Sequence, residues 1–516
     1  EVLREAAESR PDQIALIEVH RDPRLRRIWT YAQLLAEAEQ SAAALAAKLE
    51  PGSHVAVWSS NRPEWVIAQF ALALAGMVLV TVNPALTEYE LAYVLRQSGS
   101  RALLHETEYR GVVLRDVLDR AARLEPLNLA FVLPLETLTE ALAGAVAVGL
   151  PSVQAAQPAM LQYTSGTSGK PKGVMLSHYS ITNNSRLMAL IKGQDERSVN
   201  LLVAPLFHTG GCVGGVLATV QTLGTIVLPD AFDADLILDL IERERVTYTF
   251  AVPTMLISLL QAQERRPRDV ASLQTIFSGG TVVPEEIVRR VEECLGATVV
   301  IGYGLTETSP AITHTRLDDT PADKATTIGR PIPHVEVRIV DPHTGVTQPL
   351  GQPGELCTRG FHLMLRYHDM PEETARCIDA EGWLHTGDLC SMDARGYCRV
   401  HGRLKDMIIR GGENIYPREI EDILYAHPAL SEVAVVGVPD DYWGEEVAAV
   451  LVARPGHTPT AADLRSYAEA RLAKFKVPRR WYAVASLPMT ASGKLQKFRL
   501  AEMLHSGDLE AFRLPV

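Results

Sequence analysis

The sequence predicts an α/β protein whose parallel sheets are covered by helices on both faces, followed by a β-rich lobe and a small α/β domain. Over residues 1–105 and 198–260, apolar strand-like runs alternate with amphipathic helical segments, a pattern typical of parallel sheets covered by helices. After about residue 326, short β-like runs are separated by proline and glycine, which favours a more antiparallel lobe. From about residue 403, a helix, two strands and a second helix predict a separate α/β unit.

Two capping boxes, at 30–33 and 87–90, mark helix starts in the N-terminal part. The apolar side of the first helix carries Leu34, Leu35, Ala38 and Leu45. Strands are expected at 54–59, 77–82 and 101–105.

Residues 65–87 carry no charged side chain, and the run is long enough to cross a bilayer. Pro63 suits the first turn of a helix and Gly76 suits its end, while 77–82 is a β-branched run typical of a buried strand. We therefore predict a helix and a strand of a soluble domain here, with no transmembrane segment.

Shorter signals follow in the second half of the chain. Pro417 leads a helix with Ile420, Ile423 and Leu424 at helical spacing, and Thr460 caps a later one. Strands are expected at 335–340, 354–359, 432–438 and 447–452.

Composition and charge narrow the functional classes. The 516 residues are 47% hydrophobic and 22% charged, which is ordinary globular usage. Fifty basic and 62 acidic residues leave a net charge of −12, an unfavourable balance for binding nucleic acid or an anionic membrane. A small anionic ligand stays compatible with this balance, because it needs only a local positive patch.

The six cysteines form no C-x-x-C pair and have no histidine cluster beside them at zinc spacing. This pattern disfavours a metal site and a disulfide framework, and favours a reducing compartment such as the cytoplasm. The sequence begins at Glu1, so a removed targeting segment is left open.

The strongest chemical signal is the run Tyr-Thr-Ser-Gly-Thr-Ser-Gly-Lys-Pro-Lys-Gly-Val at 163–174. Such a loop offers backbone N–H groups and hydroxyls to phosphate oxygens, and its lysines add positive charge. It is not a Walker loop, because Lys170 is followed by Pro171 instead of Ser or Thr. The candidate phosphate ligands are Thr164, Ser165, Gly166, Thr167, Ser168, Gly169, Lys170 and Lys172.

Four further motifs follow in order, and together the five resemble the adenylate-forming superfamily of acyl- and aryl-CoA synthetases, peptide-synthetase adenylation domains and beetle luciferases. They are Gly-Tyr-Gly-Leu-Thr-Glu-Thr at 302–308, Gly-Trp-Leu-His-Thr-Gly-Asp at 382–388, Gly-Arg-Leu-Lys-Asp-Met-Ile-Ile-Arg-Gly-Gly at 402–412, and Pro-Met-Thr-Ala-Ser-Gly-Lys at 488–494. The resemblance covers essentially the whole chain. The segments starting at Asn414 and Ser492 look most like those of medium- and long-chain fatty acyl-CoA synthetases.

The resemblance implies a large domain, residues 1–402, with two doubly wound sheets and the β-rich lobe, and a small mobile domain, residues 403–516. The implied reaction joins a hydrophobic carboxylic acid to coenzyme A through an acyl-adenylate, with ATP and Mg²⁺, and releases AMP and pyrophosphate. The alternative acceptor is the pantetheine thiol of a carrier protein. Oligomeric state is left open.

In the reaction that the resemblance implies, cations and oriented hydrogen-bond donors must offset the repulsion between the carboxylate of the acid and the triphosphate of ATP. Lys494 resembles the lysine that bridges the carboxylate and the α-phosphate. Glu307 matches the Mg²⁺ ligand, with Thr167 as a second metal contact, because a hard cation prefers oxygen. Thr306 is expected to bond the α-phosphate. Thr306 and Glu307 could instead simply cap a helix.

The nucleotide site also follows by resemblance. Asp388 matches the aspartate that binds both ribose hydroxyls, and Arg403 matches an arginine that reaches the ribose. The adenine is expected to lie between two strand ends, with Tyr303 stacked on it and glycines that admit the flat base. These strand ends carry Gly279, Gly280, Thr281, Gly302, Tyr303 and Gly304.

For the acyl site, His208 resembles a family residue beside the reacting carboxylate. The glycines after it, Gly210, Gly211, Gly214 and Gly215, are expected on a pocket-lining helix with no cation nearby, so that volume selects the acid. Close packing of the helix against a sheet is an equally good reading of these glycines.

For coenzyme A, the resemblance assigns Gly411 and Gly412 to the pantetheine tunnel and Trp443 beside it. The basic stretch 474–480, with Phe475 and Arg479, could hold the nucleotide phosphates or be a solvated loop. Lys405 occupies the position of the family's hinge. Rival functions are a P-loop phosphotransferase, which the absent Walker pattern disfavours, and an inactive acyl-nucleotide binder.

Overall fold

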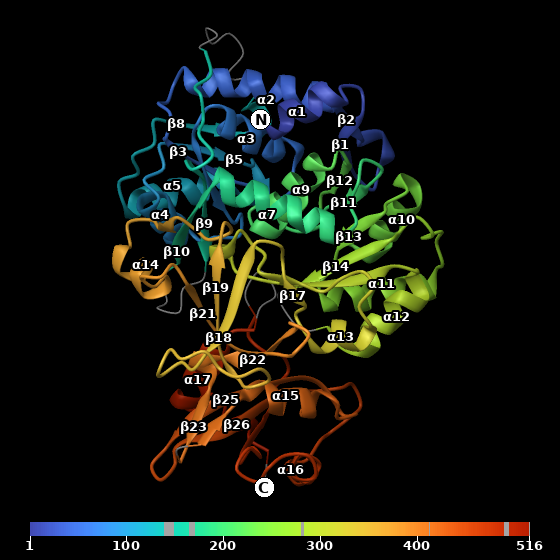
Figure 1. Ribbon diagram of the computed structural model, residues 1–516, viewed down its shortest axis with the longest axis vertical. Coiled ribbons are helices and arrows are strands. Elements are labelled where there is room, and N and C mark those ends of the chain that lie inside the picture. Colours follow the sequence, from blue (N-terminus) through green and yellow to red (C-terminus); the bar gives the residue numbers. More distant parts are fainter. Residues whose placement is uncertain (139–148, 165–170, 280–282, 412, 490–494, 515–516) are drawn as a thin grey trace. The chain divides into compact units, whose positions relative to one another are not determined.

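The protein is a mixed α/β structure in a computed structural model, as the sequence predicts (Figure 1). The structure describes residues 1–138, 149–164, 171–279, 283–411, 413–489 and 495–514. Unit 1 comprises Glu1–Val337, Thr358–His385 and Arg395–Cys398, and unit 2 comprises Arg338–Cys357, Thr386–Ala394 and Arg399–Val516. The boundary placed between residues 402 and 403 stays a prediction.

Unit 1 holds two large sheets. The first has nine strands in the order β17 (Arg330–Pro331), β16 (Thr313–His314), β15 (Thr298–Tyr303), β14 (Thr275–Gly279), β13 (Tyr248–Phe250), β11 (Val199–Leu201), β12 (Thr225–Pro229), β1 (Ile14–Val19) and β2 (Arg27–Thr30). Strands β15 to β1 of this order pair in parallel. The predicted parallel sheet is confirmed.

The second sheet has seven strands in the order β20 (Arg366–Tyr367), β10 (Lys172–Ser177), β9 (Pro158–Thr164), β4 (Val78–Val82), β3 (His54–Trp58), β5 (Ala102–His105) and β8 (Phe131–Pro134). Strands β9 to β8 of this order are parallel, whereas β10 and β20 add an antiparallel edge. The carboxyl ends of β9, β4 and β3 therefore lie at one edge of the sheet, and their amino ends lie at the other.

One apolar core fills the space between the two sheets, joining side chains such as Leu16 of β1 to Leu79 of β4. Two outer cores cover the other faces, with α10, α11 and α12 on the first sheet and α4 and α5 on the second (Figure 1). The helices that the structure describes in unit 1 are α1 (Val2–Ser9), α2 (Tyr31–Ala46), α3 (Pro63–Leu74), α4 (Glu88–Gln97), α5 (Leu114–Leu124), α7 (His178–Ile191), α8 (Thr209–Gly211), α9 (Ala218–Gln221), α10 (Ala234–Glu244), α11 (Pro253–Arg265), α12 (Glu285–Leu295), α13 (Pro321–Thr326) and α14 (Pro371–Cys377).

Both capping boxes are confirmed. The Thr30 hydroxyl accepts from the Gln33 N–H while the Gln33 side chain accepts from the Thr30 N–H, and α2 begins at the next residue. Thr87 and Glu90 make the same reciprocal pair at the start of α4. Four orphan N–H groups begin every helix, so these side chains stabilise helices that the apolar pattern alone would not delimit.

The uncharged run at 65–87 folds as the helix α3 followed by the strand β4. Gly76 separates them with a φ of +65°, a left-handed conformation that glycine adopts without a Cβ clash. Trp65 and Met77 are both fully buried in the core between the sheets. Of the helices that the structure describes, none has the length and apolarity that a membrane crossing needs.

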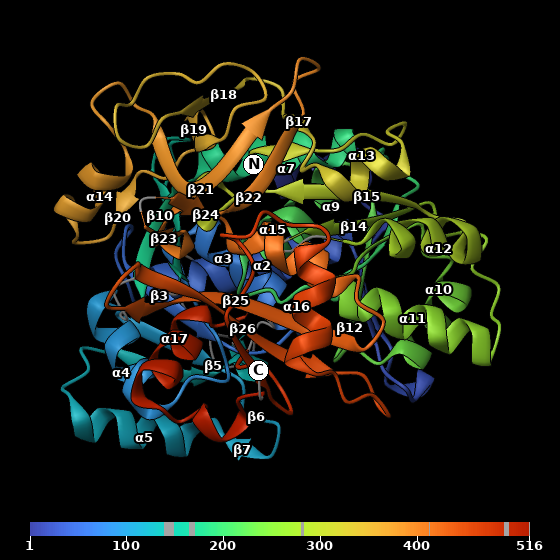
Figure 2. The same cartoon turned by 90° about the horizontal axis from the view of Figure 1, so that it is seen from below.

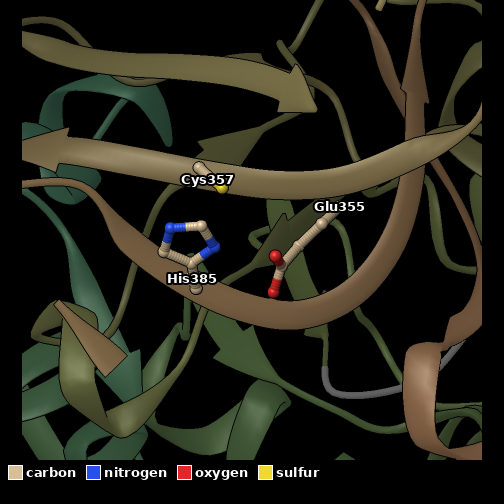
Figure 3. Close-up of side chains that lie close together, drawn as sticks. All are labelled: Glu355, Cys357 and His385. Carbon is tan, nitrogen blue, oxygen red and sulfur yellow. The ribbon is translucent and has the colours of Figure 1, made fainter. Parts of the chain in front are cut away.

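The predicted β-rich lobe is a four-stranded sheet in the order β18 (Val335–Val340), β19 (Gly354–Gly360), β21 (Leu384–Met392) and β22 (Cys398–Arg403). β19 carries Glu355 and Cys357 two residues apart and therefore on one face, and β21 carries His385 (Figure 3). The Glu355 carboxylate accepts the N–H of Gly387 at 2.9 Å. This bond fixes the β21 backbone one residue before Asp388.

The C-terminal part of unit 2 is an α/β fold around β25 and β26, which pair antiparallel over ten residue pairs. Alternate residues of β25 face two cores: Val435 packs with α15 and α16, and Val436 packs with α17 (Figure 2). The elements are β23 (Ile408–Arg410), β24 (Glu413–Ile415), α15 (Pro417–Tyr425), β25 (Leu430–Asp440), β26 (Gly444–Ala453), α16 (Ala461–Glu469), β27 (Arg480–Ala483) and α17 (Lys497–Ser506).

Candidate active site

Strands β9 and β10 flank the predicted phosphate loop. Thr164 at the end of β9 lies opposite Lys172 at the start of β10 in the antiparallel ladder. Their position at the carboxyl end of a parallel strand is where α/β sheets place ligands. The other predicted phosphate contacts lie outside the described residues and stay predictions: Ser165, Gly166, Thr167, Ser168, Gly169 and Lys170.

Lys172, the first residue of β10, is a predicted phosphate ligand that the structure describes. Its ammonium pairs with the carboxylate of Glu373 and lies 5.0 Å from the ring centre of Tyr367. The hydrogen bond from Lys172 lowers the pKa of the Glu373 carboxyl. Because Glu373 already compensates the charge of Lys172, a phosphate at Lys172 would have to compete with that carboxylate.

Glu307, the predicted Mg²⁺ ligand, is held by the same tyrosine. The Tyr367 hydroxyl donates to Glu307 Oε1 at 2.7 Å, and the Glu307 carbonyl accepts the N–H of Met364 at 2.8 Å. Burial, followed by the nearby Glu307 carboxylate, raises the pKa of Tyr367, so this hydroxyl stays a donor. One carboxylate oxygen is therefore oriented by the protein, and the carboxylate has the chemistry that a hard cation requires.

Thr308, and not Thr306 or Glu307, supplies the side chain that caps the short helical turn here. In the short 3₁₀ turn Thr306–Thr308, the Thr308 hydroxyl accepts the N–H of Leu305 at 2.9 Å. Thr308 is fully buried, while Thr306 and Glu307 are partly exposed. This arrangement leaves both predicted ligands outside the capping role, and their contacts with substrate stay predictions.

The predicted adenine strands end side by side, with Gly279 of β14 opposite Gly302 of β15. A Cβ on Gly302 would lie 2.5 Å from the Phe277 ring, and one on Gly304 would lie 1.8 Å from the Pro310 carbonyl oxygen. Both glycines are thus required by the protein's own packing, in addition to any role in admitting a base. Tyr303 is half-buried between them, and Gly280 and Thr281 lie outside the described residues.

His208 lies directly before α8 and is half-buried, with its ring 4.9 Å from that of Phe207. The loop leading to it is fixed by Asn61, which follows β3. The Asn61 amide donates to the Ala204 carbonyl at 3.0 Å, and its oxygen accepts the Leu206 N–H at 2.8 Å. Asn61 is therefore a positioning residue for the segment that presents His208.

The predicted glycine helix is present, and its central turn, Cys212–Leu217, is a π-helix, a form frequent at functional sites. A Cβ on Gly211 would lie 2.2 Å from the Pro205 carbonyl oxygen, so this glycine serves close packing, the alternative reading of the sequence. A Cβ on Gly215 would lie 2.3 Å from the Leu202 side chain, and a Cβ on Gly214 would lie 3.1 Å from the end of Met188 and 3.8 Å from the Thr209 carbonyl oxygen. A Cβ on Gly210 would meet no atom within 4 Å.

A cation lies beside these glycines, so the expectation that none would be nearby is wrong. The Lys192 ammonium donates to the Gly214 carbonyl oxygen at 3.3 Å. It also lies 4.7 Å and 5.2 Å from the ring centres of Tyr248 and Phe277. Lys192 is 1% exposed, and no carboxylate among the described residues forms an ion pair with it. Desolvation lowers its pKa to about 7.

In unit 2, the two predicted ribose ligands form an ion pair. Arg403 Nε lies 3.1 Å from Asp388 Oδ1. Asp388 is buried at 4% exposure, and its N–H donates to the Thr386 hydroxyl at 3.1 Å. A buried carboxylate is suited to accept hydrogen bonds from two hydroxyl groups, and half-exposed Arg403 makes a charge-assisted contact with it.

The predicted coenzyme A residues Gly411 and Trp443 are in contact, through a Gly411 N–H to Trp443 carbonyl bond of 2.8 Å. Gly411 has a φ of +60°, and a Cβ there would lie 2.6 Å from the indole. The Arg410 guanidinium stacks 4.4 Å from the same ring and bonds Glu446, which also lies 3.7 Å from Arg479.

Four further residues of unit 2 were predicted to take part: Phe475, Lys405, Gly412 and Lys494. Phe475 packs at the edge of the α15–α16 core, and Lys405 is exposed in a 3₁₀ turn, Leu404–Asp406. Gly412 and the catalytic lysine, Lys494, lie outside the described residues. Their roles stay predictions.

Comparison with known families agrees with this geometry over most of the chain. The model of the AMP-binding enzyme family matches residues 3–368, and that of the AMP-binding enzyme C-terminal domain matches residues 419–494. The chain belongs to the AMP-binding enzyme family. The resemblance drawn from the five motifs is confirmed.

Individual relatives of this AMP-binding enzyme span nearly its full length. The YngI protein of Bacillus subtilis is 39% identical over 97% of this chain and 96% of its own. The medium-chain acyl-CoA ligase ACSF2, mitochondrial, of Macaca fascicularis is 35% identical over 97% of this chain and 86% of its own. Two solved structures superpose closely on this chain. ATP-bound MatB from Rhodopseudomonas palustris has a TM-score of 0.88 at 30% identity, over 97% of this chain and 98% of its own. O-succinylbenzoate coenzyme A synthetase (MenE) from Bacillus subtilis, with ATP and magnesium ion, has a TM-score of 0.84 at 32% identity, over 97% of this chain and 98% of its own.

The chain is thus an AMP-forming acid–thiol ligase, an ATP-dependent acyl-CoA synthetase whose cofactors are those of its family: ATP, Mg²⁺ and coenzyme A. The oxygen donor Glu307 fits Mg²⁺, and buried Asp388 fits a ribose diol.

Sequence reasoning missed several residues of this AMP-binding enzyme that the structure brings to the site. Tyr367 and Glu373 stand outside all five motifs, and only the fold of the β20 edge places them beside Glu307 and Lys172. Lys192 carried a weak signal, because it interrupts an otherwise apolar helix end where a buried position is expected.

Proposed function

We propose that this synthetase acts on a hydrophobic carboxylic acid, of medium or long chain or otherwise bulky. The observation that carries the proposal is the π-helical turn after His208, which consists of buried Cys, Val, Gly and Leu. The nearby Lys192 ammonium is engaged by a carbonyl and two aromatic rings, which leaves it poorly placed to read a second carboxylate. The name of the relative ACSF2, a medium-chain acyl-CoA ligase, supports the same class.

The first half-reaction joins the acid to the nucleotide. A carboxylate oxygen of the acid attacks the α-phosphorus of ATP, the bond to the bridging oxygen breaks, and pyrophosphate leaves. When bound, Mg²⁺ neutralises phosphate charge. Glu307 would hold it through the oxygen that Tyr367 does not occupy, while Thr306 and the loop at 164–172 donate to phosphate oxygens. Lys494 would bridge the two reacting anions.

The second half-reaction transfers the acyl group. The coenzyme A sulfur attacks the acyl carbonyl carbon, and AMP leaves with the electrons of the broken mixed-anhydride bond. Asp388 and Arg403 would retain the nucleotide through its ribose. Gly411, whose N–H donates to the Trp443 carbonyl oxygen, would line the pantetheine tunnel together with Trp443.

The experiment is a pyrophosphate-release assay across a panel of acids, with and without coenzyme A. The panel holds straight-chain acids of two to eighteen carbons, polycyclic acids, and dicarboxylic acids of matched length. We expect a maximum at medium or long monocarboxylic acids. A preference for dicarboxylic acids would contradict the hydrophobic class, while pyrophosphate release on no acid would contradict the reaction itself.

The alternative acceptor is a carrier-protein pantetheine. The same assay separates the two, since coenzyme A would then fail to accelerate turnover while the adenylate still forms. We favour coenzyme A because the matched relative is named a CoA ligase. We also keep the cytoplasm as the proposed compartment, noting that the name of ACSF2 places that relative in mitochondria.

A further inference from the structure

Four polar side chains are buried near the carboxyl ends of two parallel strands of the second sheet. They are Gln69 of α3, Thr81 of β4, Gln162 of β9 and Cys212, the first residue of the π-helical turn. Each is at most 5% exposed, and Cys212 and Met160 belong to the apolar core that fills the space between the two sheets. Burying an amide in an apolar core is costly unless it is hydrogen-bonded, so the partners of these side chains decide what they do.

Cys212 connects three segments of unit 1. Its sulfur accepts a hydrogen bond from the Gln162 amide at 3.2 Å, and its carbonyl oxygen accepts one from the Gln69 amide at 3.1 Å. The same thiol donates to the His208 carbonyl oxygen at 3.2 Å. Burial raises the pKa of the Cys212 thiol to about 12, so the thiol keeps the proton that it donates. Strand β9, helix α3 and the segment that carries His208 therefore meet at this residue.

The backbone of His208 is held from both sides. Its carbonyl oxygen accepts the N–H groups of Gly211 and Cys212 at 2.9 and 3.0 Å, in addition to the thiol. Asn61, shortly before α3, bonds the segment that precedes His208, and Gln69, within α3, bonds the segment that follows it. Side chains from one short part of the chain therefore fix the backbone before and after the histidine.

Gln162 also belongs to the strand that leads into the predicted phosphate loop. It lies two residues before Thr164, so both side chains project from the same face of β9. Its amide nitrogen donates to the sulfur of Met160 at 2.9 Å as well as to that of Cys212. These two bonds orient the amide between the two sulfur atoms. The start of the phosphate loop and the His208 segment are thus joined through one buried side chain.

The energetics of this network favour a role in geometry over a role in stability. Gln69 Oε1 and Thr81 Oγ1 are buried without a hydrogen-bond partner among the residues that the structure describes. Thiol and thioether sulfurs are weak acceptors, so the bonds of Gln162 offset only part of its desolvation cost. Apolar side chains of similar size would avoid this cost, which indicates that the network serves the placement of its neighbours.

We propose that Gln162 and Gln69 are positioning residues that act through Cys212 to hold His208 at the reacting carboxylate. The inference rests on the proposed function and on the predicted place of His208 beside that carboxylate. The acid and the triphosphate must react between the His208 segment and the phosphate loop, so a link between these segments sets the geometry of the reaction. A misplaced His208 slows the reaction of bound substrates without weakening their binding.

The test is a double-mutant cycle on adenylation, measured by pyrophosphate exchange with the most active acid of the panel. Gln162→Leu and Gln69→Leu remove the amides at similar volume, and each is made in the parent and in the His208→Ala background. In the parent, we expect each to lower kcat roughly 3–10-fold with nearly unchanged KM for the acid and for ATP. In the His208→Ala background, each should lower kcat by less than about twofold, because the residue to be positioned is gone.

Cys212→Ser and Cys212→Ala separate positioning from packing. A serine hydroxyl can donate to the His208 carbonyl and accept from Gln162, whereas alanine can do neither. We expect Cys212→Ser to keep more adenylation activity than Cys212→Ala. Because alanine suits an apolar core better, a purely structural role would give the reverse order. Gln263→Leu is the matched control, since its amide bonds only the Arg268 backbone beyond the end of α11, and it should react as the parent does.

Thermal melts verify that the variants fold, and the two Cys212 variants decide the matter if a leucine variant unfolds. Equal loss from Gln162→Leu in both backgrounds, or an unchanged kcat in His208→Ala, would overturn the proposal and leave the synthetase reaction in place. Activity of Cys212→Ala equal to or above that of Cys212→Ser would do the same. Pyrophosphate release by the parent on no acid would overturn the proposed function, and this inference with it.

Discussion

The Lys192 ammonium donates to the Gly214 carbonyl oxygen at 3.3 Å, at the π-helical turn that the acyl site is built on. The two residues come from different helical segments, 22 positions apart, and the lysine is buried between the rings of Tyr248 and Phe277. Cation–π contacts of this kind offset part of the desolvation of an ammonium. These contacts do not offset the whole desolvation cost, since burial still lowers the pKa of Lys192 to about 7.

Lys192→Met should therefore change how stability depends on pH. The folded pKa lies below that of a free lysine, so between pH 7 and pH 10 the unfolded state binds more protons, and stability contributed by this group rises with pH. Methionine removes that dependence. In urea unfolding, the free energy of unfolding of the variant minus that of the parent should be larger at pH 6 than at pH 9, by about 2–3 kcal/mol.

Exposed Lys48 provides the control for this prediction, because Lys48→Met removes a charge without changing a buried group. A difference between parent and Lys192→Met that is the same at both pH values would contradict the assigned pKa.

Tyr367→Phe should weaken adenylation without unfolding the protein. The hydroxyl donates to Glu307 at 2.7 Å, and hydrogen bonds to charged groups contribute about 1.5–3 kcal/mol, hence roughly 10–100-fold in rate. Because Tyr367 orients a metal ligand, the Mg²⁺ concentration for half-maximal pyrophosphate exchange should also rise. Tyr482→Phe is the matched control, since that hydroxyl bonds a carboxylate at 3.2 Å in unit 2. If the Mg²⁺ dependence of the variant equals that of the parent, Tyr367 does not position Glu307.

Local signals predicted the fold well where one residue type decides a conformation. The capping boxes at Thr30 and Thr87 and the glycine at Gly76 gave element boundaries to within about two residues. They succeeded because a helix start and a left-handed turn depend on neighbours in sequence. The strand orders of the two large sheets depend on contacts far apart in the chain, and the sequence did not predict them. The family resemblance implied only that there would be two doubly wound sheets.

The site shows the same division. Glu307 and Asp388 stand in motifs and were predicted, whereas their partners were not all found. Arg403 was assigned beside the ribose by its motif, but Tyr367 reaches Glu307 only through a short edge strand that has no sequence signature. The glycine at Gly211 was ambiguous for a physical reason: a missing side chain looks alike whether a ligand or the Pro205 backbone occupies the space.

Gly214→Leu should shift chain-length preference. A Cβ there would lie 3.1 Å from the end of the Met188 side chain and 3.8 Å from the Thr209 carbonyl oxygen, and we expect a leucine to fill space at the predicted acyl site. Activity on long or polycyclic acids should fall more than activity on acetate-sized acids, with each lost methylene contact contributing about 1–3 kcal/mol. Gly210→Ala is the control, because nothing lies within 4 Å of its Cβ position. Equal loss on short and long acids would show that Gly214 does not line the pocket.

Lys494→Ala should abolish adenylation but largely spare thioester formation from supplied acyl-AMP. The lysine of the 488–494 motif is expected to act only while pyrophosphate leaves. A charge-assisted contact to the transition state contributes about 3–4 kcal/mol, or roughly 10²–10³ in rate. The two half-reactions are measured separately, by pyrophosphate exchange and by coenzyme A consumption. Equal loss in both would refute the assignment.

Lys405→Pro should spare adenylation and impair thioester formation, the reverse of what is expected for Lys494→Ala. Lys494 is needed in the first step, whereas Gly411 and Trp443 are needed in the second, and all three belong to unit 2. We predict that the small domain rotates about Lys405 between these steps, which requires freedom of the backbone dihedrals. Proline fixes φ near −65° and removes the N–H, so it should hold the domain in one state, the adenylating one.

Pyrophosphate exchange by Lys405→Pro should then survive, while the coenzyme A-dependent product falls by orders of magnitude. Lys405→Ala is the matched control, because it removes the same exposed side chain and leaves the backbone free. A thermal melt distinguishes a trapped domain from an unfolded one, since proline could instead disrupt the 3₁₀ turn Leu404–Asp406. If the variant melts like the parent and keeps both half-reactions, the hinge lies elsewhere in the chain.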